Sequence, residues 1–475
     1  MGRSLQIRSL LSLFPNLTLK GSRAVKITGV CSHSKQVAPG MLFVARRGRT
    51  HDGGRFIHEA LKAGAVAIAS DLYDHSLKVP QIITEDLQHL EGPLAAAFYG
   101  YPSHKMATIG ITGTSGKTSV SYLLRHLLEG VGIPTGLIGT VEVITGRERG
   151  STGMTTPDPS TLQRLLHEMV QHRCRAAILE ATSHGLAQGR LEGTLFSAAC
   201  FTNLTHEHLD YHGTMEAYAE AKGLLFRNAP RAALNGDDPW HTRMGAPSPL
   251  LYGLSPTHDL YATDLTSTPT GTHFTLHYRG KTLPVTLPLA GRFNVYNALA
   301  ALAVAILQDI EIKQLTPILA TFPGVPGRLE RIPSLRPFSL YVDFAHKPDA
   351  LEQVLVTLRP LTKRRLITVV GCGGDRDRAK RPLMGEVATR LSDITLFTSD
   401  NPRTEEPAQI CQEMAMGGHP TEIIVDRRSA IAHAIAIAEE GDTILIAGRG
   451  HEQHQILAHG VVPFDDRQVA KELLT

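Results

Sequence analysis

The chain has 475 residues, 20% of them charged, a formal net charge of +3 at pH 7 and five cysteines. This length exceeds the size of one hydrophobic core and predicts two or three domains. The mild charge, without a cluster of Lys and Arg, argues against a nucleic-acid-binding face, and cysteines without a C-x-x-C pair argue against a disulfide framework or a zinc–thiolate site.

The N-terminal segment, residues 1–103, predicts a small α/β domain. Residues 41–45 and 65–69 have the composition of strands, whereas residues 56–63 have the apolar spacing of a helix. The turn-forming sequence YGYPS at residues 99–103 marks the end of the segment.

The second segment, residues 104–324, predicts a larger domain with a parallel sheet. A β-prone run at residues 107–112 leads through a glycine-rich turn into a helical pattern at residues 119–129. Further strand-like runs follow at residues 176–179 and 198–201. Strands that alternate with helical patterns are typical of a parallel sheet flanked by helices.

The third segment, residues 325–475, repeats this pattern and predicts a second parallel sheet. It follows the sequence FPGVPG at residues 322–327, whose prolines and glycines disfavour both helix and strand. Its strand-like runs, at residues 366–370, 394–398 and 443–447, are separated by helical patterns.

Two apolar stretches bear on location. Residues 9–14 are fewer than a secretory signal peptide requires, and residues 298–307 reach about half of a membrane span. We therefore expect a cytoplasmic, soluble, monomeric protein whose partners are small molecules rather than nucleic acid or membrane.

The sequence GITGTSGKT at residues 110–118 lies where a strand turns into a helix. Backbone N–H groups and the helix dipole would face a polyphosphate there, with Lys117 on the β and γ oxygens and Thr118 on Mg²⁺. The alternative is a glycine-rich turn that only connects two elements. The general P-loop has glycine where this chain has Ile111, which favours an ATP-dependent peptide ligase over a motor or GTPase.

Polar residues follow two of the expected strands. Glu180 would lie at the carboxyl edge of the sheet, where it could hold Mg²⁺ or remain a solvated charge. His206, His208 and His212 suggest zinc, but no thiolate accompanies them, and exposed loop histidines are an equal alternative for His206 and His212. On composition alone, Lys222 is typical of a lysine on a helix surface.

Several motifs occur in a fixed order: VAPGMLFVA (37–45), DGGRFI (52–57), TGTSGKT (112–118), TTPD (155–158), residues 203–213, GRFNVYN (291–297), GRLE (327–330) and VDFAH (342–346). Together they resemble the Mur ligase family, in particular its members that add the third amino acid of the peptide. The resemblance implies an α/β fold with the three-domain Mur ligase architecture: a small N-terminal α/β domain (1–103) that binds the UDP substrate, a central P-loop ATPase-like parallel-sheet domain (104–324) that binds ATP, and a C-terminal Rossmann-like α/β domain (325–475) that binds the amino acid.

The resemblance also implies roles for individual residues. ATP would be bound by Gly113, Thr114, Ser115, Gly116, Lys117, Thr118, Asn294, Asn297, Arg328, Asp343 and His346. Mg²⁺ would be held by Thr118, Glu180, His208 and Lys222, the last as a carbamate, and the catalytic residues would be Lys117, Lys222 and His208. The UDP substrate would be bound by Ser32, Ser34, Thr155, Thr156, Thr182, Gln188 and Arg190. Near Ser32 the family's usual Asp-Ser-Arg is replaced by HSK (33–35). Polar packing between domains is the alternative for the ATP residues outside the phosphate loop, Asn294, Asn297, Arg328, Asp343 and His346.

The sequence DNPR at residues 400–403 bears on the amino acid that is added. A guanidinium can pair bidentately with the second carboxylate of diaminopimelate. Arg403 and Arg376 match positions that hold carboxylates in the diaminopimelate-adding members, whereas the lysine-adding members lack the arginine of this tetrapeptide. The remaining contacts implied by the resemblance are Asp400, Asn401, Pro402, Gly448 and Glu452. For each of these charges the alternative is a structural ion pair.

The resemblance implies an ATP-dependent amide-forming ligase of peptidoglycan synthesis, which would add meso-diaminopimelate to UDP-N-acetylmuramoyl-L-alanyl-D-glutamate through an acyl phosphate. Three alternatives stay open: a lysine-adding Mur ligase, a ligase like folylpolyglutamate synthase, and a P-loop ATPase that acts on nucleic acid or protein.

Overall fold

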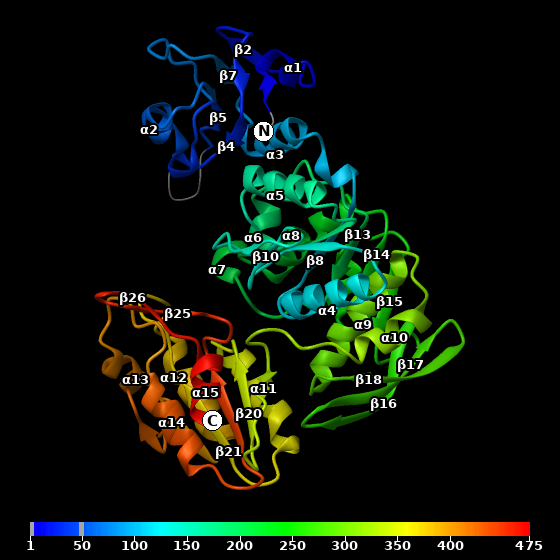
Figure 1. The fold of residues 1–475 in the computed structure, drawn as a ribbon, viewed down its shortest axis with the longest axis vertical. Coiled ribbons are helices and arrows are strands. Elements are labelled where there is room, and N and C mark those ends of the chain that lie inside the picture. The colour runs from blue at the N-terminus through cyan, green and yellow to red at the C-terminus, as the bar shows by residue number, and fades with distance from the viewer. Residues whose placement is uncertain (1–3, 47–51) are drawn as a thin grey trace. The chain divides into compact units, whose positions relative to one another are not determined.

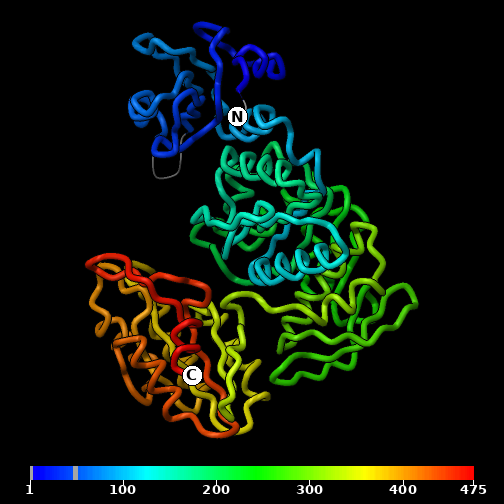
Figure 2. Tube along the Cα trace, in the orientation of Figure 1, coloured from blue at the N-terminus to red at the C-terminus, as the bar shows by residue number. Residues whose placement is uncertain are grey.

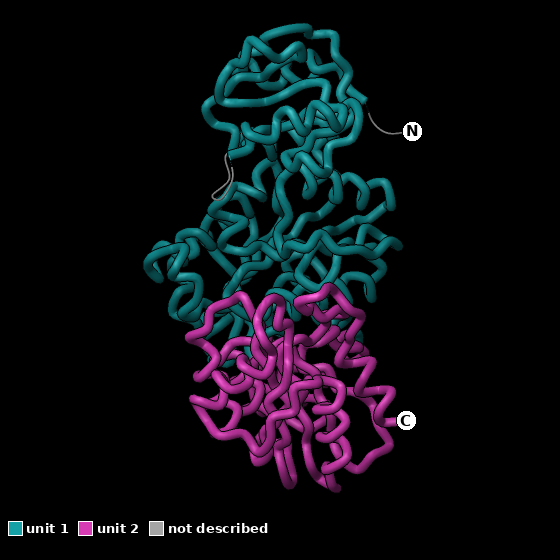
Figure 3. Tube along the Cα trace, turned by 90° about the vertical axis from the view of Figure 1, so that its left-hand side faces the viewer, with its two compact units in different colours: residues 1–261, 296–318 teal, residues 262–295, 319–475 magenta. Residues whose placement is uncertain are grey.

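The computed structural model describes residues 4–46 and 52–475. The chain forms two compact units, which Figure 3 colours separately. Unit 1 comprises residues 1–261 and 296–318, and unit 2 comprises residues 262–295 and 319–475. The predicted segment boundaries near residues 103 and 324 stay predictions.

The N-terminal part of unit 1 contains a five-stranded sheet. Its spatial order is β2 (Thr18–Lys20), β7 (Gln81–Ile83), β6 (Ala67–Ser70), β5 (Met41–Val44) and β4 (Gly29–Cys31). Neighbouring strands in this sheet are parallel, except for the antiparallel pair β2 and β7. The other elements are β1 (Leu5–Gln6), α1 (Ile7–Leu11), β3 (Lys26–Ile27), α2 (Ile57–Lys62) and α3 (Leu87–Tyr99). The predicted strands at 41–45 and 65–69 and the helix at 56–63 are therefore confirmed.

Helix α3 has clear start and stop signals in the sequence. Asp86 precedes it and its side chain accepts a hydrogen bond from the His89 N–H, as an N-cap residue does. Gly100 ends it in the left-handed conformation. The helix is almost entirely buried because it packs against both the N-terminal sheet and helix α5 (Pro159–Gln171), as Figure 1 shows.

The central part of unit 1 contains a sheet with a parallel core. Its spatial order is β11 (Arg149–Gly150), β10 (Val143–Ile144), β9 (Thr135–Ile138), β12 (Ala176–Glu180), β8 (Ala107–Thr112), β13 (Ala198–Phe201), β14 (Ala232–Asn235) and β15 (Leu250–Gly253). From β9 to β15 every neighbouring pair is parallel. The helices of this part are α4 (Lys117–Gly130), α5, α6 (Ser183–Ala187), α7 (Leu209–His212), α8 (Met215–Arg227) and, where the chain returns to unit 1, α9 (Arg292–Leu307) and α10 (Ile312–Leu319).

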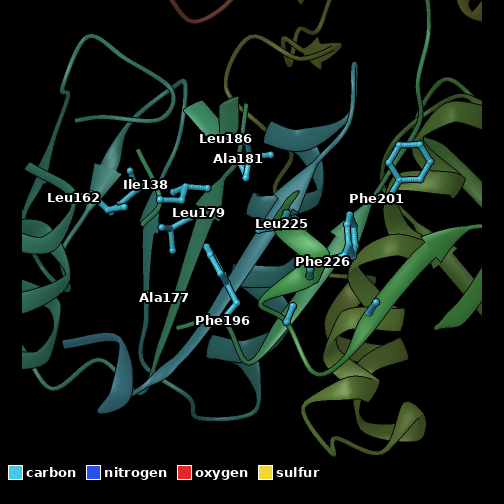
Figure 4. Packing of buried hydrophobic residues seen from close by; sticks show 14 of the residues in the cluster. Ile138, Leu162, Ala177, Leu179, Ala181, Leu186, Phe196, Phe201, Leu225 and Phe226 are labelled. Atoms are coloured by element: carbon cyan, nitrogen blue, oxygen red, sulfur yellow. The ribbon is translucent and has the colours of Figure 1, made fainter. Parts of the chain in front are cut away.

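The core of this part forms because the strands are apolar over their whole length. Leu162 of α5 packs with Ile138 and Leu179 of the sheet, and Phe196 and Leu225 belong to the same buried cluster (Figure 4). Each such side chain contributes roughly 1.5–3 kcal/mol when it is fully buried. Within residues 4–46 and 52–475, no helix is long and apolar enough to cross a membrane, α9 with its apolar residues 298–307 included.

Unit 2 contains a second parallel sheet. Its spatial order is β19 (Glu330–Arg331), β20 (Ser339–Asp343), β24 (Thr443–Ala447), β21 (Leu366–Val370), β22 (Ile394–Phe397) and β23 (Glu422–Ile423), and only β19 runs antiparallel to its neighbour. Its helices are α11 (Pro348–Leu358), α12 (Lys380–Leu391), α13 (Pro407–Ala415), α14 (Arg427–Ile437) and α15 (Asp466–Leu474). Apolar clusters cover both faces, which explains the unbroken apolar runs that predicted these strands.

Two hairpin regions complete unit 2. The strand β16 (Leu260–Thr268) begins beside β15 and continues into this unit, where β17 (Gly271–Tyr278) and β18 (Lys281–Leu287) form a long antiparallel hairpin, drawn in green in Figure 2. A shorter hairpin joins β25 (His454–Leu457) and β26 (Gly460–Pro463).

Candidate functional site

The predicted phosphate loop joins the end of β8 to the start of α4, so the expected strand–loop–helix unit is confirmed. Gly116 precedes the helix with φ of +86°, a conformation that residues with a Cβ rarely adopt. The Lys117 ammonium donates to the carbonyls of Gly113 (2.8 Å) and Thr114 (2.9 Å), which keeps its charge over the loop. The N-terminus of α4 faces this loop, where backbone N–H groups can receive an anion.

Asn203, for which we predicted no role, holds this loop in shape. Its side-chain oxygen accepts from the Ser115 N–H at 2.9 Å, and its carbonyl accepts from the Thr114 N–H at 2.8 Å. The neighbouring Thr202 hydroxyl donates to the Ser115 carbonyl at 2.6 Å. A sequence signal existed, because Asn203 follows β13 at the same edge of the sheet as the loop.

Glu180 is the last residue of β12 and is only 1% exposed, so the alternative of a solvated charge is wrong. Its Oε2 accepts from the Thr118 hydroxyl at 3.0 Å and from the Thr140 hydroxyl at 2.9 Å. Its Oε1 accepts from the Thr140 N–H at 3.1 Å. Thr140, which follows β9, is a site residue that sequence reasoning missed.

Lys222 is also only 1% exposed, so its interpretation as a helix-surface lysine is wrong. Its Nζ donates to the Gly113 carbonyl at 2.8 Å and lies 4.5 Å from the centre of the Tyr218 ring. Burial and then the charge of Lys117 hold the pKa of Lys222 well below its ordinary value. Composition cannot tell which face of α8 is turned toward the phosphate loop.

The histidines of residues 203–212 differ in their surroundings. His206 is exposed, as one alternative allowed. The His208 ring lies 4.7 Å from that of His184, centre to centre, and burial together with the nearby lysines lowers its pKa. His212 stacks on Tyr218 at 5.0 Å, and burial lowers its pKa to about 4.

Both of these rings are therefore neutral near pH 7, and a neutral imidazole can bind a metal. Among the residues that the structure describes, no three His, Cys, Asp or Glu side chains are grouped to hold a metal ion by themselves. The Thr118 hydroxyl, which lies beside Glu180, is a further oxygen donor at this place.

Five of the predicted UDP-substrate residues come together beside Glu180: Thr155, Thr156, Thr182, Gln188 and Arg190. The Thr156 hydroxyl lies 2.9 Å from that of Thr182, and the Arg190 guanidinium donates to the Thr156 carbonyl at 2.8 Å. Arg190 also donates to the Gln188 side chain at 2.7 Å. The Thr155 hydroxyl lies 3.0 Å from that of Thr140.

Ser32 and Ser34 lie in the N-terminal part of unit 1, and a buried carboxylate connects Ser32 to this group. Glu91 of α3 is 0% exposed, and it accepts from the Ser32 side chain and from the Ser160 N–H. Arg46 lies 3.6 Å from Glu91 and donates to Asp158 at 3.1 Å. This network, which the sequence did not reveal, fixes the loop before α5 to the N-terminal sheet.

The predicted ATP residues beyond the loop fall in both units. In unit 1, the Asn297 side chain lies against Gly116 of the phosphate loop. A Cβ added to Gly116 would come within 2.5 Å of the Asn297 Oδ1. In unit 2, Asp343 ends β20 and accepts from the N–H groups of Leu329 (2.5 Å) and Ala345 (2.7 Å). Burial raises the pKa of Asp343.

Three further predicted ATP residues lie in unit 2. The Asn294 side chain donates to the Ala290 carbonyl at 2.8 Å. The Arg328 guanidinium covers the Phe344 ring at 4.5 Å, and the His346 Nδ1 lies 2.9 Å from the Phe344 carbonyl. Burial lowers the pKa of His346, so its ring is neutral near pH 7.

The predicted amino-acid site lies at the carboxyl edge of the unit 2 sheet, where ligands bind in such folds. The Asn401 side chain donates to Glu452 at 2.8 Å, and a Cβ on Gly448 would come within 2.7 Å of the Asp400 carboxylate. Asp400, Asn401, Pro402, Arg403, Gly448 and Glu452 are thus brought together. Burial and the charge of Asp400 raise the pKa of Glu452.

The two arginines of this site lie on adjacent loops. Arg403 donates to the Gly374 carbonyl at 2.7 Å, two residues before Arg376. Within residues 4–46 and 52–475, neither arginine forms an ion pair, so the alternative of a structural ion pair is wrong for both. The charge of Arg403 still acts on Glu452 at longer range, where it opposes the rise in the pKa of that carboxyl.

Three family descriptions match the chain. Residues 26–99 match the Mur ligase family catalytic domain, residues 111–305 the Mur ligase middle domain, and residues 327–450 the Mur ligase glutamate ligase domain.

Two relatives match over nearly their whole length, and each is named UDP-N-acetylmuramoyl-L-alanyl-D-glutamate--2,6-diaminopimelate ligase. The protein from Chlamydia caviae is 42% identical over 462 residues, which cover 95% of both chains. The protein from Geobacillus thermodenitrificans is 41% identical over 483 residues, which cover 98% of this chain and 99% of the relative.

Two solved structures of Mur ligases are also similar to this chain. A structure of an enzyme with that same name is 33% identical, with a TM-score of 0.72 over 99% of each chain. The MurF ligase from Thermotoga maritima in complex with ADP is 18% identical and shares the fold alone, with a TM-score of 0.64 over 94% of this chain and 96% of that one.

Proposed function

The chain belongs to the Mur ligase family, and from this premise we propose that it is an ATP-dependent ligase that joins meso-diaminopimelate to UDP-N-acetylmuramoyl-L-alanyl-D-glutamate in peptidoglycan synthesis. The observation that carries the choice of amino acid is the pair Arg376 and Arg403, which lie on adjacent loops and form no ion pair with a carboxylate among the residues that the structure describes. Lysine has no second carboxylate to meet them, whereas diaminopimelate has one.

The phosphate loop supports the use of ATP. A carboxylate is a poor acyl donor, so the substrate carboxylate attacks the γ-phosphorus, and an acyl phosphate and ADP form. Lys117 lies on the loop and stabilises the charge of the transferring phosphoryl group. The amino group of diaminopimelate then attacks the acyl carbon, the phosphate leaves with the bonding electrons, and the amine proton passes to solvent.

The donor set beside the loop fits Mg²⁺ once Lys222 is modified. The Thr118 hydroxyl and the Glu180 carboxylate are oxygen donors 3.0 Å apart, and His208 is neutral. An ammonium group at Lys222 would repel the cation, but carbamylation, in which the neutral amine adds to CO₂ and releases a proton, turns it into an oxygen donor. When bound, Mg²⁺ neutralises charge on the phosphates.

The two substrate groups would bind at the clusters described above. Ser32, Ser34, Thr155, Thr156, Thr182, Gln188 and Arg190 would bind the UDP substrate. Asn294, Asn297, Arg328, Asp343 and His346 would bind the nucleotide. Asp400, Asn401, Pro402, Gly448 and Glu452, with the two arginines, would bind diaminopimelate. The reaction would take place in the cytoplasm, where ATP is available, and a monomer would suffice for it.

One assay tests the proposal. The purified full chain is incubated with ATP, Mg²⁺ and the UDP-muramoyl dipeptide, and ADP release is measured with meso-diaminopimelate, with lysine, or with neither. We expect release that requires diaminopimelate. Release that ignores the amino acid would overturn the ligase, whereas a preference for lysine would overturn only the substrate. The variant Lys117→Ala serves as the inactive control.

A further inference from the structure

The two loops that carry Arg376 and Arg403 both contain a backbone conformation that needs support. Asp375 has φ of +53° and Arg403 has φ of +54°, values that residues with a Cβ adopt only where neighbouring contacts hold them. Asp375 directly precedes Arg376. One of these two conformations is at Arg403 itself and the other is directly before Arg376. Contacts that stabilise them therefore also affect the direction of the two guanidinium groups.

Hydrogen bonds join the loops next to these positions. The Thr404 hydroxyl donates to Oδ1 of Asp375 at 2.7 Å, and the Thr404 N–H donates to Oδ2 at 3.2 Å. The Asp375 N–H in turn donates to Oε1 of Glu405 at 2.6 Å. Asp375, next to Arg376, and Thr404, next to Arg403, are thus joined by direct hydrogen bonds between the two loops.

Arg381 of α12 holds the Glu405 carboxylate in place. Its side chain is fully buried and donates to both carboxylate oxygens of Glu405, at 3.0 and 2.8 Å. It also donates to Glu413 at 2.6 Å and to the Gly373 carbonyl at 3.3 Å. A buried guanidinium therefore ties the start of one loop to the end of the other.

We propose that Arg381, Glu405, Asp375 and Thr404 form a positioning network that sets the spacing of Arg376 and Arg403, and that this spacing selects an amino acid with a second carboxylate. The inference rests on the proposed function. A carboxylate that is held by two guanidinium groups gains most of its affinity only when both donors have the right distance and orientation. Lysine lacks this carboxylate, so its use does not depend on the spacing.

The exposed residue Thr404 offers a test that spares the buried part of the network. The variant Thr404→Val loses the hydroxyl and keeps the backbone N–H. We expect its KM for meso-diaminopimelate to rise about fivefold, the usual effect of one lost hydrogen bond. We expect kcat, the KM for ATP, the KM for the UDP substrate and any rate with lysine to stay unchanged.

Two variants serve as controls. Thr404→Ser keeps the hydroxyl and should behave as the wild type. Thr421, which precedes β23, is also exposed, and its hydroxyl accepts from the Thr395 N–H; Thr421→Val should have no effect on any KM. Asp375→Ala should raise the same KM, and the double variant with Thr404→Val should be no worse than Asp375→Ala, because Asp375→Ala already removes the contact that Thr404→Val removes.

An unchanged KM for diaminopimelate in Thr404→Val would overturn the positioning network, and so would an equal rise in every KM or a lower melting temperature without a selective KM change. These outcomes leave the proposed function intact if the wild type uses diaminopimelate. A wild type that does not use diaminopimelate would overturn the proposed function and this inference together.

Discussion

The Thr140 hydroxyl donates a hydrogen bond of 2.9 Å to Oε2 of Glu180. The same hydroxyl lies 3.0 Å from that of Thr155, and Glu180 also accepts from Thr118 of the phosphate loop. Thr140 therefore connects the proposed Mg²⁺ ligands with the loop that would bind the UDP substrate.

Replacing Thr140 by Val should remove the hydroxyl contacts with both Glu180 and Thr155. We expect the Mg²⁺ concentration for half-maximal rate and the KM for the UDP substrate each to rise about fivefold, because each side loses one hydrogen bond. Titration calorimetry with Mg²⁺·ATP checks the first effect apart from turnover. Thr140→Ser should restore both values, and a change confined to the KM for diaminopimelate would contradict the connection.

Lys222→Ala should lower kcat about 100-fold or more, because a ligand of the proposed Mg²⁺, which neutralises charge on the phosphates, is lost. If Lys222 acts as a carbamate, short carboxylates such as acetate should restore part of the rate. Mass spectrometry of the intact wild type in bicarbonate should show the added CO₂. An unrescued Ala variant beside a fully active Lys222→Glu variant would indicate a plain charge role instead.

Arg403→Ala should raise the KM for meso-diaminopimelate about 10- to 100-fold, the range for losing hydrogen bonds to a charged group. ATP binding, measured by fluorescence or calorimetry, should be unchanged. Arg403→Lys keeps the charge but loses the planar fork, so we expect it to recover only a small part of the affinity. An equal loss of ATP binding would argue for a structural role.

Asp466→Asn should strongly destabilise unit 2. Asp466 and Arg427 are both fully buried and share two hydrogen bonds of 2.7 Å, while Arg427 also donates to the carbonyls of Ser399 and Ala447. Removing one partner of such a pair costs about 3–5 kcal/mol, because the other charge stays buried.

The chain contains a matched control for this variant. Arg428 and Glu472 pair at 2.9 Å between the same two helices, α14 and α15, but both side chains are about half exposed. Arg428→Ala should lower the free energy of unfolding by at most about 1 kcal/mol. Denaturant unfolding compares the two variants, and similar losses would show that burial does not decide the effect.

His451 should make the stability of unit 2 depend on pH. Burial, and then the nearby charges of Arg328 and Arg467, lower its pKa to about 4. The unfolded state keeps a pKa near 6.5, so between pH 6.5 and pH 4 the unfolded chain binds a proton that the folded chain does not. Stability from this group is thus full above pH 6.5 and falls as the pH is lowered.

The variant His451→Gln checks this dependence. Between pH 7 and pH 5 the wild type should lose about 1–2 kcal/mol more than the variant in denaturant unfolding. A parallel loss in both proteins would show that His451 titrates normally in the folded state.

The sequence by itself determined the elements and the local motifs. Strands such as Leu366–Val370 are buried on both faces, so an unbroken apolar run identifies them. The phosphate loop is equally local, because its chemistry comes from consecutive backbone N–H groups between β8 and α4. Resemblance extended this to the family, which the comparisons confirmed.

Only the tertiary structure decided which distant groups individual polar side chains contact. Lys222 has the composition of a surface lysine, yet packing turns it against the carbonyl of Gly113, more than a hundred residues away. Likewise, Thr140 meets Glu180, and Asp375 meets Thr404, because parallel strands end at one edge of a sheet and bring distant loops together. Periodicity and composition describe neighbours along the chain, whereas these contacts depend on the order of the strands.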